Sequence, residues 1–195
     1  RMRPRVSDSR IGTFLTLKQH ISEQADELQR YSLANRWRVE PSDVEAFRRG
    51  EMVEPVTPIV FYLDPLFPES WKEPIRKGIV RWNVAFEKIG FKNVIQVRDF
   101  PTDDPNFDPD NLKYSCIRYV PSTTQNAMGP SWVDPMTGEI LNASIMVYND
   151  VVKMLYNWRF VQTAQLDTSV RAKELPQDVF EESLAYVIAH EMGHC

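Results

Sequence analysis

Cysteine is scarce in this sequence, which has only Cys116 and Cys195 among its 195 residues. The two do not form a C-x-x-C pair, and two thiols are too few for the disulfide framework that supports small secreted domains. We therefore expect no bridge between them. One should be a buried thiol in a strand, and the other a thiol at the end of a helix.

Long apolar runs and an excess of positive charge are also missing. No stretch approaches the roughly 18 apolar residues that span a bilayer, and the opening RMRPRVSDSR lacks the apolar centre of a signal peptide. The net charge of -4 gives no basic surface for nucleic acid. We expect no transmembrane segment and no nucleic-acid partner. Because the chain begins with Arg1, we expect an excerpt of a longer protein whose targeting segment could have been removed.

The remaining composition is that of a globular protein, with 43% hydrophobic and 26% charged residues. Residues 1–57 are polar and rich in arginine, and their apolar stretches at 11–17 and 31–39 could form short strands. A short helix and a connector are expected within 41–58, where three prolines occur. We therefore divide the chain into an N-terminal extension, 1–57, and a main domain, 58–195.

A strand and a long helix open the main domain. Residues 59–63, IVFYL, follow Pro58 and precede an Asp-Pro turn signal, and this apolar run predicts a buried strand. Apolar residues at spacings of three and four then predict one helix of about five turns, starting between Ser70 and Pro74 and closed by Gly90. The predicted buried face consists of Trp71, Ile75, Ile79, Trp82, Phe86 and Ile89.

Further strands follow this helix. Two are expected at 94–97 and 116–120, and the order strand, helix, strand implies a right-handed crossover and a parallel pair. A hairpin then joins 131–133 to 139–147 through the turn sequence DPMTG.

Two helices complete the pattern. Asn149 or Asp150 can cap the first, and the last has Asp178 as its expected N-cap with Glu181 three residues later. The order of elements predicts an α/β layered domain with a mostly parallel sheet and at least one antiparallel partner.

The last helix carries the motif H-E-M-G-H at residues 190–194. Because a helix turns every 3.6 residues, His190 and His194 share one face, where both imidazoles can bind one ion at about 2.0 to 2.1 Å. Zinc suits this geometry and these ligands best. Glu191 is adjacent, so its carboxylate can take a proton from a metal-bound water without binding the metal. We therefore expect zinc-dependent hydrolysis of peptide bonds, with Glu191 as the general base.

The motif supplies two of the three protein ligands that a catalytic zinc normally has. The remaining histidine, His20, lies in the polar stretch KQHISEQ, and we expect it to be an exposed helix or loop residue and not a ligand. The third ligand is therefore expected beyond Cys195, and the 195 residues alone are expected to be inactive.

These residues resemble the metzincin clan of zinc peptidases, and within it the large secreted bacterial zinc-dependent metalloproteases. The most specific segments are GPSWVDPMTGEIL at 129–141 and AYVIAHEMGHC at 185–195, and the resemblance covers most of the chain. It implies His190 and His194 as zinc ligands and Glu191 as the base. It also implies a secreted, periplasmic or cell-surface location.

The resemblance further implies a zincin-like fold. This is the N-terminal part of a catalytic domain, with a mixed, mostly parallel twisted sheet, an antiparallel edge strand, a backing helix and an active-site helix. In metzincins the motif extends to H-E-x-x-H-x-x-G-x-x-H and a Met-turn follows; neither has a position in this sequence. The segment 129–133 would be the edge strand, with which an extended protein or peptide substrate could pair by backbone hydrogen bonds.

Two other functions are compatible with the motif. One is a non-catalytic module that binds peptides at the sheet edge and keeps the zinc site as a relic. The other is a zincin of another clan, with a glutamate as the third ligand. The residues after Cys195 distinguish all three, because glycine and histidine at the expected offsets favour the metzincin enzyme.

Overall fold

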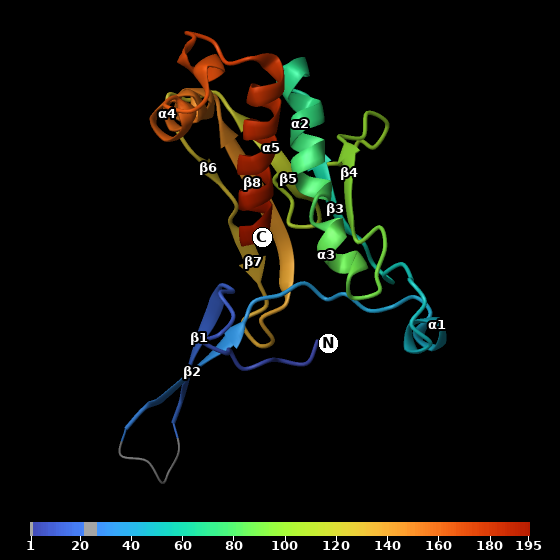
Figure 1. Ribbon diagram of the computed structural model, residues 1–195. Coiled ribbons are helices and arrows are strands. Elements are labelled where there is room, and N and C mark those ends of the chain that lie inside the picture. Colours follow the sequence, from blue (N-terminus) through green and yellow to red (C-terminus); the bar gives the residue numbers. More distant parts are fainter. Residues whose placement is uncertain (1, 22–26) are drawn as a thin grey trace.

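The computed structural model describes residues 2–21 and 27–195 as a mixed α/β structure (Figure 1). The elements, in chain order, are β1 (Leu15–His20), β2 (Gln29–Ala34), α1 (Val44–Arg48), β3 (Ile59–Leu63), α2 (Glu69–Val80), α3 (Asn83–Glu87), β4 (Ile95–Asp99), β5 (Ser115–Val120), β6 (Ala127–Met128), β7 (Ser131–Val133), β8 (Ile140–Tyr148), α4 (Val151–Thr163), a short 3-10 helix (Thr168–Arg171) and α5 (Gln177–His194).

The main sheet is mostly parallel, as the order of strands and helices predicted. Its strand order is β4-β3-β5-β8-β6, and β7 also pairs with β8. Strands β4, β3, β5 and β8 are mutually parallel, whereas β6 and β7 run antiparallel to β8. The antiparallel strands therefore lie at one edge. The parallel pair around α2 and the hairpin of β7 and β8 are both confirmed; β6, with only two residues, was not predicted.

Helices α2 and α5 lie side by side over one face of the main sheet (Figure 1). They approach closely at Gly78, where an added Cβ would lie 2.6 Å from the carbonyl oxygen of Ala185. Apolar side chains fill the space between helices and sheet, and fully burying each contributes about 1.5 to 3 kcal/mol. The largest fully buried ones include Phe61, Leu63, Ile75, Ile79, Ile117, Ile145, Leu184 and Ile188.

The long helix predicted after β3 is two helices, α2 and α3, separated at Arg81 and Trp82. The separation has a tertiary cause, because consecutive side chains there bond to different elements. The Trp82 indole donates to the carbonyl oxygen of Ala189 in α5. The Asn83 side-chain amide donates to the carbonyl oxygen of Ile95 in β4 and accepts from its N–H, both at 2.9 Å.

The predicted buried face is correct for α2 and holds only in part for α3, where Phe86 is half-buried and packs against the core. Trp71, Ile75 and Ile79 are buried, but Trp82 is 40% exposed and Ile89 is also exposed, because α3 turns away from the core. Gly90 does end α3, with a φ of 90° that glycine adopts without strain.

The starts of two helices differ from the predicted caps. Helix α2 begins at Glu69, after Pro68, and contains Pro74. Helix α5 begins at Gln177, after Pro176, whose carbonyl oxygen accepts from the N–H of Phe180. Asp178 is therefore in the first turn, where its negative charge interacts favourably with the positive end of the helix dipole. It makes no capping hydrogen bond.

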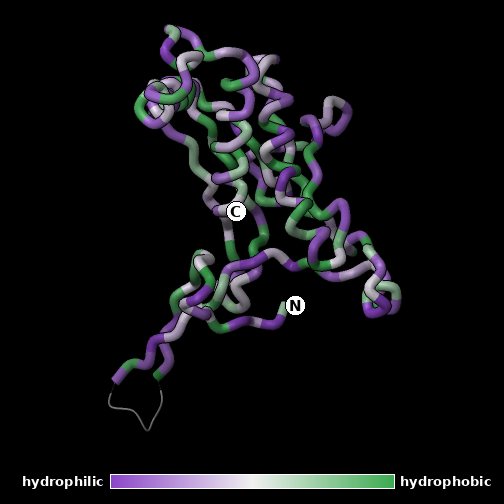
Figure 2. Tube along the Cα trace, viewed as in Figure 1, coloured by the Kyte–Doolittle hydropathy of each residue, from purple (hydrophilic) through white to green (hydrophobic). Residues whose placement is uncertain are grey.

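Strands β1 and β2 form a separate antiparallel hairpin, which we call the arm (residues 15–20 and 29–34). It projects from the main body below the C-terminal end of α5 (Figure 1). Hydrophobic and hydrophilic residues both occur along it (Figure 2). The predicted strands at 11–17 and 31–39 are displaced, because backbone pairing continues through polar residues such as Lys18 and does not follow the apolar stretches.

Residues before position 58 also pack on the main body. Ala46 of α1 and Val53 belong to the same hydrophobic core as Phe91, and Val53 forms a bridge with Phe91. The division into 1–57 and 58–195 stays a prediction. Within the described residues, no helix has the length and apolar content to cross a membrane, in agreement with the sequence.

Candidate metal centre

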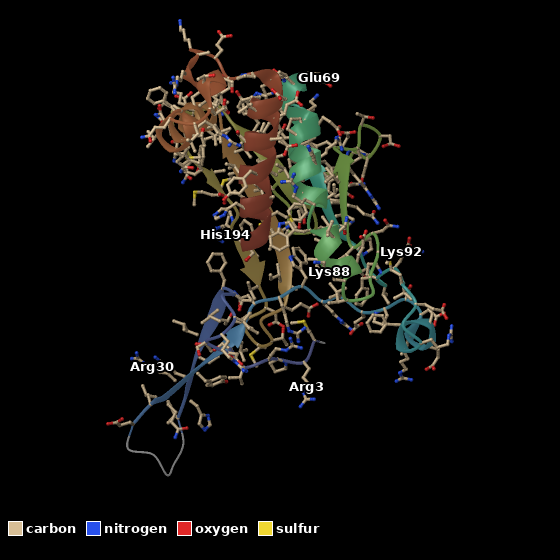
Figure 3. The ribbon with its side chains drawn as sticks, in the orientation of Figure 1. Arg3, Arg30, Glu69, Lys88, Lys92 and His194 are labelled. Carbon is tan, nitrogen blue, oxygen red and sulfur yellow. The ribbon has the colours of Figure 1, made fainter. Side chains whose placement is uncertain are left out.

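The two histidines of the motif converge at the C-terminal end of α5. Their Nε2 atoms lie 3.0 Å apart, and the ring centroids are 4.7 Å apart with the planes at 89°. A tetrahedral ion with bonds of about 2.05 Å would hold its two nitrogens ~3.3 Å apart, so a small ring movement admits one zinc. Both side chains are exposed. His190 and His194 therefore fit as a pair of ligands to one ion; Figure 3 shows His194 at the helix end.

Glu191, unlike His190 and His194, is buried, with 9% of its surface exposed. Burial raises the pKa of Glu191 above the ordinary value of a glutamate, and the nearby charges of His190 and His194 oppose this shift. Its carboxylate is therefore a stronger base than an exposed one.

The described residues supply no third ligand. Among residues 2–21 and 27–195, no group of three or more His, Cys, Asp or Glu side chains could hold a metal ion, so Glu191 does not join His190 and His194 as a ligand. His20 is exposed, as predicted, but it lies at the far end of β1, where it pairs with Gln29, and not in a helix or loop. The position of the third ligand stays a prediction.

On the side of α5 that faces α3, Trp82 holds the helix in place. The Trp82 Nε1 donates to the carbonyl oxygen of Ala189 at 2.8 Å, one residue before His190. The same indole packs against Gly193, where an added Cβ would lie 2.7 Å from the ring. The sequence predicted Trp82 to be a core residue; it is a half-exposed residue that holds the last turn of α5, which carries His190 and His194.

The residues that precede and follow the arm reach the other side of this turn. The ring of Phe14 stacks on that of His194, with centroids 5.3 Å apart and planes at 21°. The Trp37 Nε1 donates to the carbonyl oxygen of Cys195 at 2.9 Å. Sequence reasoning missed both contacts, because neither residue belongs to a motif and both lie far from α5 in the chain.

The antiparallel edge of the sheet runs beside the same turn. Gly129, between β6 and β7, lies against α5, where an added Cβ would be 2.6 Å from the carbonyl oxygen of Glu191. The Cys195 thiol contacts the Gly129 carbonyl oxygen at 3.5 Å. In the described part of the chain, no strand pairs with the outer edge of β6 and β7. An extended peptide could pair there, close to the histidines.

A groove of about 530 Å³ lies between α3 and α5, next to His190. Trp82, Val84 and Tyr186 contribute apolar surface to it, and Lys88 lies at its border. Tyr186 is 61% exposed and faces this groove.

Both cysteines are free and buried. As predicted, Cys116 lies in a strand, β5, and Cys195 lies at the end of a helix, α5. Burial raises the pKa of Cys116 to about 12, and it raises the pKa of Cys195 to about 12 as well. Neither thiol is therefore a nucleophile at neutral pH, since the thiolate is the reactive form.

No family model, curated protein or solved structure matches this chain. Two convergent imidazoles and one adjacent buried carboxylate can hold a metal ion and move a proton beside it.

Proposed function

We propose that this protein is a zinc-dependent endopeptidase of the metzincin type. The observation that supports the proposal is the convergence of the His190 and His194 Nε2 atoms to 3.0 Å, with the Glu191 carboxylate on the same helix. Two nitrogens so placed satisfy half of a tetrahedral zinc coordination. The resemblance in sequence supports the same proposal and adds a secreted, periplasmic or cell-surface location.

Bound zinc would supply an acidified water and polarise the scissile carbonyl group. Glu191 then accepts a proton from the attacking water at a carboxylate oxygen and delivers it to the leaving amine. The raised pKa of Glu191 suits this exchange, because burial makes its carboxylate a stronger proton acceptor than an exposed glutamate. The edge formed by β6 and β7 holds the extended substrate by backbone hydrogen bonds.

In this proposal the third ligand lies outside the described residues, in the extended motif with its glycine and histidine. Two imidazoles alone bind zinc weakly. The 195 residues by themselves are thus expected to show no peptidase activity.

The test uses the full-length protein and an internally quenched peptide. We expect cleavage that a zinc chelator abolishes, and we expect Glu191→Gln to lower kcat by about 100-fold or more while zinc stays bound. Glu181→Gln, a half-buried glutamate on the same helix, is the matched control and should cleave normally. Full activity in Glu191→Gln would refute the role of that residue.

A second candidate is a peptide-binding module with a relic metal site. It is favoured by the lack of a third ligand among the described residues and by the unpaired edge of β6 and β7. The two functions differ in one measurement: the module binds a peptide without cleaving it, and Glu191→Gln leaves the binding unchanged. The residues after Cys195 would also distinguish both candidates from a zincin whose third ligand is a glutamate.

A further inference from the structure

His194 is the less well restrained of the two metal-binding histidines. It is exposed and occupies the last position of α5, where helices fray. A metal-binding histidine usually donates its second ring N–H to a carboxylate or carbonyl oxygen, which fixes the ring. No hydrogen bond from the His194 Nδ1 to a described residue is present. Another contact must orient this ring.

Phe14 supplies such a contact. Its ring covers the face of the His194 imidazole at 5.3 Å between centroids and 21° between planes, the geometry of an offset stack. Stacking occupies the face of the ring, whereas the nitrogen lone pair lies in the ring plane. The Nε2 of His194 therefore remains free to point at the Nε2 of His190.

The position of Phe14 is itself fixed by hydrogen bonds. Its carbonyl oxygen accepts from the N–H of Asn35 at 2.9 Å, and the Thr16 hydroxyl donates to the Asn35 side-chain oxygen at 2.7 Å. Trp37, two residues after Asn35, donates to the carbonyl oxygen of Cys195. The residues at the base of the arm thus hold both the side chain and the backbone at the end of α5.

We infer that Phe14 is a positioning residue of the metal centre: by stacking on His194 it holds that imidazole in the orientation that binds metal. The inference rests on the proposed zinc site and extends it to a residue of the N-terminal extension. Phe14 touches neither metal nor substrate in this role and acts through His194.

The experiment titrates the metal-free protein with Co²⁺ and records the affinity and the visible absorption spectrum. Phe14→Ala should weaken Co²⁺ binding by roughly two- to tenfold, the range expected for one aromatic pair, and should alter the spectrum because the ligand geometry changes. Phe14→Leu, which keeps apolar volume without a ring, should show the same loss. Phe14→Tyr should restore both affinity and spectrum.

The matched control is Leu17→Ala, in the same arm, since Leu17 is 79% exposed. It should bind Co²⁺ as the unaltered protein does, and thermal unfolding should show that all variants are folded. Equal affinity and spectrum in Phe14→Ala would overturn the inference, as would tighter binding, which would mean that Phe14 shields the site. Co²⁺ binding that His190→Ala leaves unchanged would instead overturn the proposed zinc site, and the inference with it.

Discussion

The indole nitrogen of Trp82 donates a hydrogen bond to the carbonyl oxygen of Ala189, 2.8 Å away on the neighbouring helix. This bond joins the break between α2 and α3 to the turn that carries His190. The same ring packs on Gly193, so one residue fixes the turn at two points.

Trp82→Phe is expected to lower the free energy of unfolding by about 1 kcal/mol, the usual net value of one hydrogen bond. Phenylalanine also lacks the outer part of the indole that packs on Gly193, so the measured loss should be at least this large. Urea denaturation followed by circular dichroism measures it. Trp158→Phe, also at a half-exposed tryptophan, is the control and should change stability less. Equal losses in the two variants would contradict this account.

Gly129→Ala should destabilise the protein by about 1 to 3 kcal/mol, because the new methyl group would lie 2.6 Å from the carbonyl oxygen of Glu191. Backbone cannot yield as a flexible side chain can, so β6 and α5 must move apart. Gly12→Ala is the matched control, since nothing lies within 4 Å of a Cβ added there. Thermal unfolding of both variants is the measurement, and an unshifted midpoint for Gly129→Ala would refute the close contact.

Zinc binding should depend on both histidines of the motif and not on the third histidine of the chain. His190→Ala and His194→Ala are each expected to weaken zinc binding strongly, because each removes one of the ligands of the proposed site. His20→Ala, in β1, should bind as the unaltered protein does. Isothermal titration with zinc tests all three, and an effect of His20→Ala would place the site elsewhere.

The Cys116 thiol should be unreactive in the native protein. Because burial raises the pKa of Cys116 to about 12, almost none of it is thiolate at pH 8, and a thiol reagent should label it only after unfolding. The unfolded chain has an ordinary thiol pKa of about 8.5. Between pH 8.5 and 12, the native protein keeps the Cys116 proton and the unfolded chain loses it. The contribution of this thiol to the free energy of unfolding therefore falls as the pH rises from about 8.5 to 12.

Cys116→Ala should reduce that loss of stability at high pH, measured by urea denaturation at several pH values. Labelling of native Cys116 at pH 8 at the rate of the unfolded chain would show that the thiol is accessible, against this account.

Regular local patterns made part of this fold predictable. The apolar run of β3 and the four-residue spacing of His190 and His194 are local features. The structure has the strand and the helix where the sequence places them. The convergence of the two imidazoles also follows from helix geometry alone.

The remainder depended on contacts between distant residues. Trp82 and Tyr186 continue apolar patterns, yet both face a groove, because the burial of a helix face is set by what packs on it. Asn83, at the start of α3, bonds to the backbone of Ile95, and no local pattern indicates this partner. The stacking of Phe14 on His194 had no signal in the sequence at all, since a single aromatic residue indicates no partner.

The bond from Trp37 to Cys195 joins residues 158 positions apart, and Phe14 reaches α5 from further still. Closing so large a loop costs chain entropy that only native packing can offset. These contacts should thus form only once α5 has packed against the sheet. A partly folded chain would carry His190 and His194 without the restraints that Trp37 and Phe14 place on the end of α5.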